Sequence, residues 1–117
     1  MCTLLVVDDD EMVRTSVSAI LTILGHEIIQ ARDGLEAAAI YLSRHDKIHL
    51  IIMDIMMPKM DGIAATKAIK KDHPSAKVIL MSGQSDQLLP KEADAFLLKP
   101  FRYKDLCETV EQVLQTV

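Results

Sequence analysis

Three carboxylates at the ends of two apolar runs are the residues with the clearest chemical potential in this sequence. Asp8 and Asp9 follow the run at residues 3–7, and Asp54 follows the run at residues 48–53. An aspartate after a strand is usually a turn residue or a helix cap, and Asp10 can serve as that cap. Capping leaves Asp8 and Asp9 unexplained, because neighbouring carboxylates repel and raise one another's pKa. Such crowding is tolerable where a cation binds.

A divalent metal and a phosphoryl group would use these residue types together. Three carboxylates in a polar cleft favour Mg²⁺, which keeps several waters and accepts carboxylate and substrate oxygens. Lys99 and Ser82 follow two later apolar runs, and they offer a point charge and a hydroxyl donor to phosphoryl oxygens. Asp54 is then a candidate nucleophile that accepts a phosphoryl group in line. No histidine or cysteine follows these runs, which leaves carboxylate chemistry as the candidate.

The elements that must position these residues alternate between strand and helix patterns. Strands are expected at residues 3–7, 27–31, 48–53, 77–81 and 95–98, and helices at about 11–24, 35–44, 61–71 and 103–115. This alternation predicts an α/β, flavodoxin-like, doubly wound parallel sheet of order 2-1-3-4-5 with helices on both faces. In that order the strand ends bring together Asp8, Asp9, Asp54, Ser82 and Lys99.

Local signals within this pattern differ in clarity. Asp33 and Asp61 stand where helix caps are expected, whereas Arg102 is a poor cap for the last helix. The helix at 35–44 is predicted to present Leu35, Ala38, Ala39 and Leu42 on one face. The segment 86–93 contains Pro90 near its middle, so any helix there must be short.

Composition limits the class of protein. The 117 residues predict one domain, 1–117, with a formal net charge of −4 and no basic stripe, so direct nucleic-acid binding is not expected. Charges interrupt every apolar run well short of a membrane span, so no membrane contact and a cytoplasmic location are expected. The two cysteines, Cys2 and Cys107, lie at opposite ends and resemble small apolar residues.

With these residues in place, the sequence resembles the receiver domains of two-component response regulators, of the chemotaxis-regulator kind, over essentially its whole length. Four motifs carry the resemblance: Asp8-Asp9, the pattern D-x-x-x-P-x-x-D-G from Asp54 to Gly62, Ser82-Gly83, and Lys99-Pro100-Phe101. The resemblance implies that Asp54 accepts a phosphoryl group from a sensor histidine kinase or phosphotransfer protein. It implies a module that catalyses only its own phosphorylation and dephosphorylation, and is otherwise not an enzyme.

The resemblance also assigns roles to individual residues. It implies that Mg²⁺ is bound by Asp8, Asp9, Asp54 and the backbone carbonyl of Met56, and that the Lys99-Pro100 peptide bond is cis. Ser82 and Phe96 are the implied switch residues, although a phenylalanine in a buried strand is usually a core residue. Met56 and Gln84 occupy the places that tune attack by water. A downstream protein partner or a fused output domain would read the signal.

One departure from the family and three alternatives accompany this reading. Lys99 follows Ser82 by only 17 positions (99 − 82), so the fourth helix of the family is expected to be shortened or irregular here. A protein-interaction module that works without phosphorylation therefore stays open as an alternative. A haloacid dehalogenase-type phosphohydrolase is disfavoured, because Met56 stands where it would need a second aspartate. A flavodoxin is disfavoured by the lack of a Ser/Thr/Gly-rich loop after the first strand.

Overall fold

Five parallel strands form one sheet of order β2-β1-β3-β4-β5, as the sequence predicts. The computed structural model describes residues 2–83 and 90–115. The strands are β1 (Thr3–Val7), β2 (Glu27–Ala31), β3 (Leu50–Asp54), β4 (Val78–Ser82) and β5 (Ala95–Leu98). The helices are α1 (Glu11–Ile23), α2 (Gly34–Arg44), α3 (Gly62–Asp72) and α4 (Tyr103–Gln115). The third strand begins two residues later than predicted (50 − 48) and takes in Asp54.

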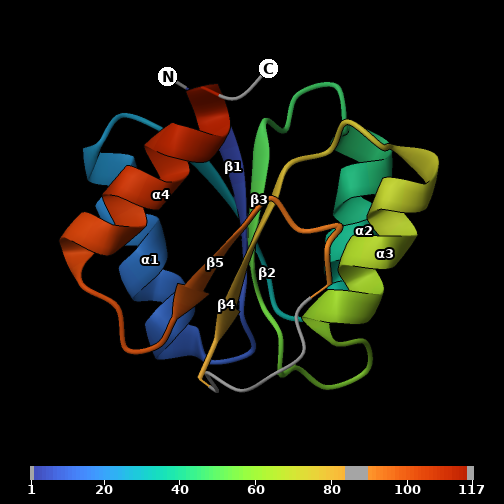
Figure 1. The fold of residues 1–117 in the computed structure, drawn as a ribbon, viewed down its shortest axis with the longest axis horizontal. Coiled ribbons are helices and arrows are strands. Elements are labelled where there is room, and N and C mark those ends of the chain that lie inside the picture. Colours follow the sequence, from blue (N-terminus) through green and yellow to red (C-terminus); the bar gives the residue numbers. More distant parts are fainter. Residues whose placement is uncertain (1, 84–89, 116–117) are drawn as a thin grey trace.

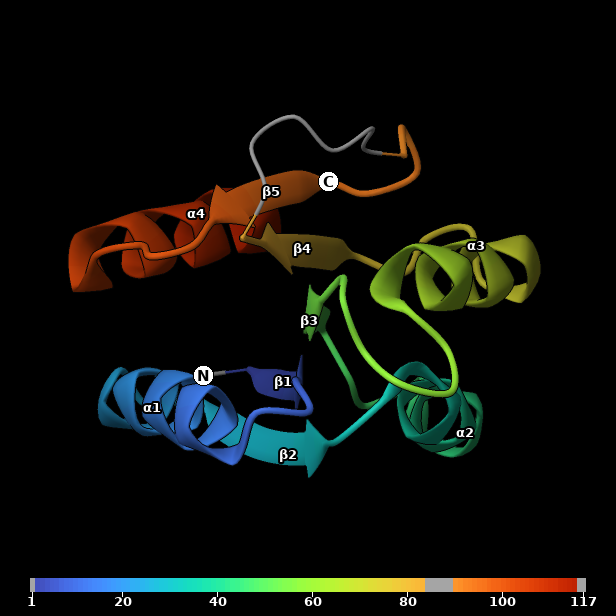
Figure 2. The same ribbon diagram turned by 90° about the horizontal axis from the view of Figure 1, so that it is seen from below.

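The helices cover both faces of the sheet. Helices α1 and α4 lie on one face and α2 and α3 on the other (Figures 1 and 2). Successive residues of β1 alternate between the two layers: Leu4 and Val6 pack with α1 and α4, whereas Leu5 and Val7 pack with α2 and α3. This two-sided burial explains why the inner strands are continuous apolar runs rather than alternating ones.

Aspartate caps begin three of the described helices. The side chains of Asp10, Asp33 and Asp61 accept backbone N–H groups at the starts of α1, α2 and α3. Helix α4 starts differently, because its own Asp105 accepts the N–H of Arg102 at 3.1 Å. A side chain inside the first turn therefore accepts the N–H of Arg102, whereas the Arg102 side chain has no acceptor atom for the N–H groups that follow it.

The predicted inner face of α2 is wrong except at Ala38, which packs against the core. Leu35 and Leu42 are exposed, at 49% and 68% of their surface, and Ala37 and Tyr41 are buried instead. Ala37 and Tyr41 belong to the buried cluster on this face of the sheet, and Ala38 is partly buried against it. Helical spacing alone does not distinguish these two faces.

The connection from β4 to β5 agrees with the expected shortening. Among the described residues, no helix lies between these two strands, and Gln84 lies outside the described residues. The edge strand β5 exposes alternate apolar side chains, with Phe96 at 40% and Leu98 at 52%. Phe96 is therefore not an ordinary core residue, although phenylalanine in a strand usually is.

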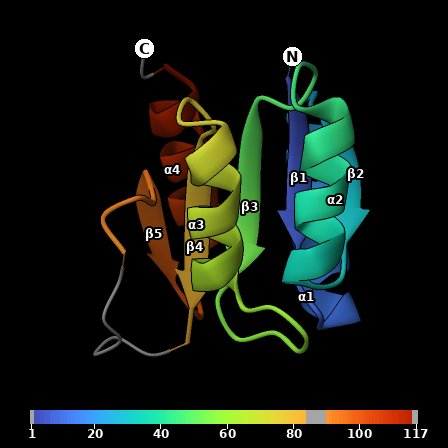
Figure 3. The ribbon, with the colours of Figure 1, turned by 90° about the vertical axis from the view of Figure 1, so that its right-hand side faces the viewer.

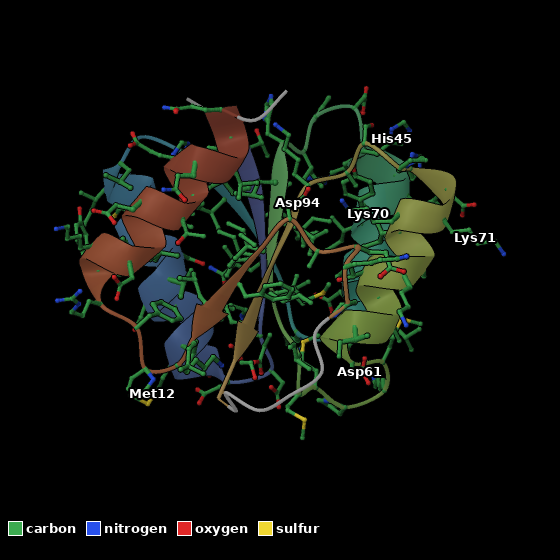
Figure 4. All side chains as sticks on the ribbon, in the orientation of Figure 1. Met12, His45, Asp61, Lys70, Lys71 and Asp94 are labelled. Atoms are coloured by element: carbon green, nitrogen blue, oxygen red, sulfur yellow. The ribbon has the colours of Figure 1, made fainter. Side chains whose placement is uncertain are left out.

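Asp94, the residue before the outer strand β5, joins β4 to α3. Its carboxylate accepts the Val78 N–H at 2.8 Å and the Lys70 ammonium at 2.9 Å, and Figure 4 shows Lys70 reaching toward it from α3. The Asp94 N–H in turn donates to the Val78 carbonyl at 2.8 Å. One residue thus fixes the start of β5 against β4 and α3.

No helix among residues 2–83 and 90–115 is both long and apolar enough to cross a membrane. This agrees with the short apolar runs of the sequence. The cytoplasmic location stays a prediction.

Replacing Asp94 with alanine should lower the free energy of unfolding by about 1–3 kcal/mol, because it leaves the buried Val78 N–H without its acceptor. Asp94→Asn keeps an acceptor oxygen and loses only the charge pair with Lys70, so it should cost less than about 1 kcal/mol. Urea unfolding measures both. Equal losses for the two variants would show that the ion pair, and not the hydrogen bond to Val78, carries the stability.

Candidate functional site

The carboxyl ends of the strands bring the predicted site residues to one edge of the sheet. All strand arrows in Figure 3 point to this edge, which is the lower edge of Figure 1. Parallel register pairs Val7 with Met53 and Ser82 with Leu98, so the residues that follow β1 and β5 lie beside the ends of β3 and β4. Lys99 N–H donates to the Ser82 carbonyl at 2.7 Å and extends the last pairing by one residue.

The Lys99 ammonium lies between two buried carboxylates. Its Nζ is 3.0 Å from Asp8 Oδ2 and 3.1 Å from Asp54 Oδ1. Asp8 is fully buried and Asp54 is 7% exposed. A buried carboxylate is expensive unless it is paired and hydrogen-bonded, so Lys99 is what allows both aspartates to remain at this edge.

The charges at this edge shift one another's protonation. Burial raises the pKa of Asp54, the nearby Asp8 raises it further, and Lys99 partly offsets both effects. Burial alone would lower the pKa of Lys99, but its hydrogen bonds with Asp8 and Asp54 outweigh burial and raise it. The ionised form of Asp54 is therefore costly in the folded protein and is held by one ammonium group.

The carboxylates of Asp8, Asp9 and Asp54 also fit a metal ion. Each offers an oxygen, and these oxygens all lie within 4.8 Å of one another. Three ionised carboxylates against one ammonium leave an excess of negative charge that suits a divalent cation. Oxygen ligands alone suit a hard ion such as Mg²⁺. Asp9 is exposed whereas Asp8 and Asp54 are buried, so the carboxylate cluster is open to solvent at Asp9.

The loop after β3 is held by a close backbone approach. Gly62 N–H donates to the Ile55 carbonyl at 2.9 Å, and a Cβ at Gly62 would lie only 2.3 Å from the Asp54 carbonyl oxygen. This explains the glycine that ends the motif from Asp54 to Gly62. Met56 sits in this loop with its side chain 63% exposed, beside the site but outside the core.

The remaining predicted residues have different outcomes. The Lys99-Pro100 peptide bond is cis, as the resemblance implied. Ser82 ends β4 and is 6% exposed, and Phe96 lies in β5. The roles of Ser82, Phe96 and Met56 stay predictions, and the tuning role of Gln84 falls outside the described residues.

Sequence reasoning missed Arg14. Its Nη1 donates to the Asp8 carbonyl and its Nε donates to Gln30 Oε1, both at 2.9 Å. The guanidinium thus ties the end of β1 to β2 from the first turns of α1. The sequence holds no signal for this, because an arginine on an exposed helix surface is usually solvated.

An apolar groove of about 610 Å³ also adjoins the site and was not predicted. It runs between α1 and the cis-proline turn. Its lining comprises Met12, Val13, Ser16, Val17, Ile20, Lys99, Pro100 and Phe101.

Residues 4–111 match the family model of the response regulator receiver domain. The chain belongs to this family. Its members are signalling modules rather than conventional enzymes, which excludes the haloacid dehalogenase-type phosphohydrolase and the flavodoxin considered above. The order of the sheet and the cluster of acidic residues are those expected of a receiver.

Among similar proteins, chemotaxis protein CheY of Treponema pallidum is 35% identical over 95% of this chain and 81% of its own length. The probable transcriptional regulator ycf27 of Porphyridium aerugineum is 35% identical over 97% of this chain, but only 48% of its own length is covered. This chain thus spans about half of that regulator. A chain of the CheX–CheY–BeF₃–Mg complex of Borrelia burgdorferi superimposes with a TM-score of 0.92 at 31% identity, over 98% of this chain and 90% of that one.

Asp54→Asn should raise the melting temperature at pH 7 without metal, by about a few degrees. The raised pKa of Asp54 means that its ionised form destabilises the folded state above that pKa, and asparagine removes the charge. At pH values below the ordinary pKa of 3.8 the carboxyl is protonated in both states, so the gain should vanish there. Differential scanning calorimetry from pH 3 to 8 measures this.

Lys99→Met should have the opposite effect on stability from Asp54→Asn and serves as its control. It leaves Asp8 buried without its cation and should cost about 3 kcal/mol in metal-free buffer. Mg²⁺ should then raise the melting temperature of Lys99→Met more than that of wild type, and that of Asp54→Asn less. A lower melting temperature for Asp54→Asn at neutral pH would contradict the electrostatics described for this site.

Proposed function

We propose that this chain is a phosphoacceptor that takes a phosphoryl group on Asp54, in a Mg²⁺-dependent reaction, from the phosphohistidine of a sensor histidine kinase or phosphotransfer protein. The observation that carries the proposal is the placement of Asp54 within 3.1 Å of the Lys99 ammonium and inside a cluster of carboxylates. This arrangement pairs a nucleophile with a cation that can bind the incoming group.

The transfer follows from the positions of these side chains. Lys99 contacts Oδ1 of Asp54, so we assign Oδ2 as the attacking oxygen. The bond from this oxygen to phosphorus forms as the phosphorus–nitrogen bond of the donor breaks, and the bonding pair returns to the imidazole nitrogen. The Lys99 ammonium and the Ser82 hydroxyl donate hydrogen bonds to equatorial phosphoryl oxygens and stabilise their charge.

Asp8, Asp9 and Asp54 would hold the metal, with the Met56 carbonyl as a further ligand. Mg²⁺ would supply positive charge against both the carboxylates and the phosphoryl oxygens. The B. burgdorferi complex contains Mg²⁺ and BeF₃, by its description, which supports the same chemistry here.

Phosphorylation would draw Lys99 from the two aspartates toward the new phosphoryl group. The Lys99 N–H bond to Ser82 couples that movement to the ends of β4 and β5. Phe96 lies in β5 and is half-exposed, so a change at Ser82 and Lys99 can reach the surface through this strand. A downstream protein partner, or an output domain in a longer polypeptide, would read that surface.

The phosphodonor would approach along the apolar groove beside Lys99. Met12 begins this groove, is 80% exposed, and projects from the lower edge of the molecule (Figure 4). An apolar surface next to a charged site suits a helical donor that carries its histidine between apolar side chains.

A second candidate is an interaction module that works without phosphorylation. The observation that favours it is the exposed apolar side chains of β5, Phe96 and Leu98, which can bind a partner in either state. It leaves unexplained the two buried carboxylates of Asp8 and Asp54 and their pairing with Lys99, which is costly to maintain for binding alone.

Incubation with acetyl phosphate and Mg²⁺ should add one phosphoryl group to the wild type and none to Asp54→Asn. Intact-protein mass spectrometry, with and without Mg²⁺, measures the adduct. If no adduct forms, beryllofluoride with Mg²⁺ should still raise the melting temperature of a receiver whose phosphoryl group is short-lived. If the wild type shows neither the adduct nor the thermal shift, the phosphorylation-independent module is the function that remains.

Met12→Glu should slow phosphorylation by a phosphotransfer protein and leave phosphorylation by acetyl phosphate unchanged. A carboxylate at this position opposes an apolar donor surface, whereas acetyl phosphate needs only the site itself. Ile23→Glu is the matched control, because Ile23 is 79% exposed on the same helix but does not line the groove. Equal slowing by both variants would place the donor elsewhere.

A further inference from the structure

The loop from residue 55 to residue 61 leaves the sheet after β3, reaches α2, and returns to start α3 (Figure 2). It carries Met56, whose backbone carbonyl is the one proposed metal ligand that is not a carboxylate. A backbone carbonyl has no side-chain freedom with which to adjust to the ion. Its position therefore depends on what fixes the loop.

The base of the loop, where it leaves β3 and enters α3, is fixed by two backbone hydrogen bonds. The Gly62 N–H bond to Ile55 closes the loop, and the Ile55 N–H donates to the Met81 carbonyl of β4 at 3.0 Å. These two contacts hold the first and last residues. They leave the far end of the loop, at Lys59 and Met60, to be fixed by a neighbouring element.

That neighbour is the start of α2. The Gly34 N–H donates to the Met60 carbonyl at 3.0 Å. A Cβ at Gly34 would lie 2.4 Å from that oxygen and 3.0 Å from Met60 C and Cβ. Any side chain at position 34 would therefore push Met60 away and break the hydrogen bond.

Asp33 adds a second contact on the same side. Its Oδ2 lies 3.9 Å from Lys59 Nζ, while its Oδ1 caps α2 through Glu36 N–H. Lys59 has a φ of 67°, a left-handed conformation that is uncommon for a lysine. Two adjacent residues at the start of α2 thus hold two adjacent residues at the far end of the loop.

The conformation of Gly34 does not by itself require glycine. Among the described residues, the glycine with a positive φ is Gly25, so Gly34 adopts a backbone conformation open to other residues. In a helix interior alanine is favoured over glycine by about 1 kcal/mol, and Gly34, as the first residue of α2, shares the direction of that preference. Helix propensity therefore favours alanine here, and the close approach of Met60 is what opposes it.

We propose that Gly34 is a positioning residue for the metal site: its bare backbone lets the first turn of α2 hold the loop that presents the Met56 carbonyl. The inference rests on the proposed function and adds a residue from an element that contributes no side chain to the site. Asp33 supports the same contact through Lys59.

Gly34→Ala should weaken Mg²⁺ binding roughly tenfold, which is the effect expected when support for a metal ligand is lost. Phosphorylation by acetyl phosphate should then need more Mg²⁺ for half-maximal rate, and saturating Mg²⁺ should restore that rate. Isothermal titration calorimetry and the Mg²⁺ dependence of adduct formation measure the two effects.

Ala39→Gly is the matched control. Ala39 lies on the exposed side of α2, and the variant exchanges alanine for glycine, the reverse of Gly34→Ala. It should destabilise the helix and leave the Mg²⁺ affinity unchanged. Equal Mg²⁺ affinity in Gly34→Ala and wild type would overturn the positioning role while leaving the proposed function intact. Failure of the wild type to bind Mg²⁺ at all would count against the proposed function instead.

The wild type offers a test that does not depend on a folded variant. In a Mg²⁺ titration followed by amide NMR, the Gly34 resonance should shift along the same binding curve as Met56, and the Ala39 resonance should not. A Gly34 resonance that stays unmoved while Met56 responds would also overturn the proposal.

Discussion

A single ammonium group between two buried carboxylates determines how this site is built. Lys99 Nζ lies 3.0 Å from Asp8 Oδ2 and 3.1 Å from Asp54 Oδ1. Without this cation, two buried aspartates could not lie together at the carboxyl ends of the strands of an apolar sheet. The same arrangement keeps the site reactive, because one cation cannot balance the charge of three carboxylates. The remaining negative charge attracts a metal, and the incoming phosphoryl group offers Lys99 another partner.

The fold serves this constraint by bringing distant segments together. Asp8 and Lys99 are 91 residues apart (99 − 8) yet end strands of one sheet. Parallel strands place these ends on one edge, and the inner strands β1, β3 and β4 are buried on both faces. Around them, short backbone contacts set the loops: Gly62 lies against the Asp54 carbonyl, and Gly34 lies against Met60. The positions of the site residues thus depend on close contacts between backbone segments as much as on contacts between side chains.

Most of the fold and of the site could be predicted, because each depends on strong local signals. Apolar runs gave the strands, and polar residues at their ends gave Asp8, Asp54, Ser82 and Lys99. Tertiary packing produced what could not be predicted. The exposure of Leu42 depends on which face of α2 meets the sheet. The exposure of Phe96 depends on the place of β5 at the edge of the sheet. The contact of Arg14 with Asp8 depends on how α1 packs beside β1 and β2.

The measurement that tests the central claim most directly is the location of the phosphoryl group. Borohydride reduces an acyl phosphate to an alcohol, so reduction after phosphorylation converts the modified aspartate to homoserine, which peptide mass spectrometry locates. We expect homoserine at position 54, dependent on Mg²⁺, with Asp8 and Asp9 unchanged. Homoserine at position 8 or 9, or a stable adduct on a residue other than aspartate, would contradict the assignment of Asp54 as nucleophile and of its neighbours as metal ligands.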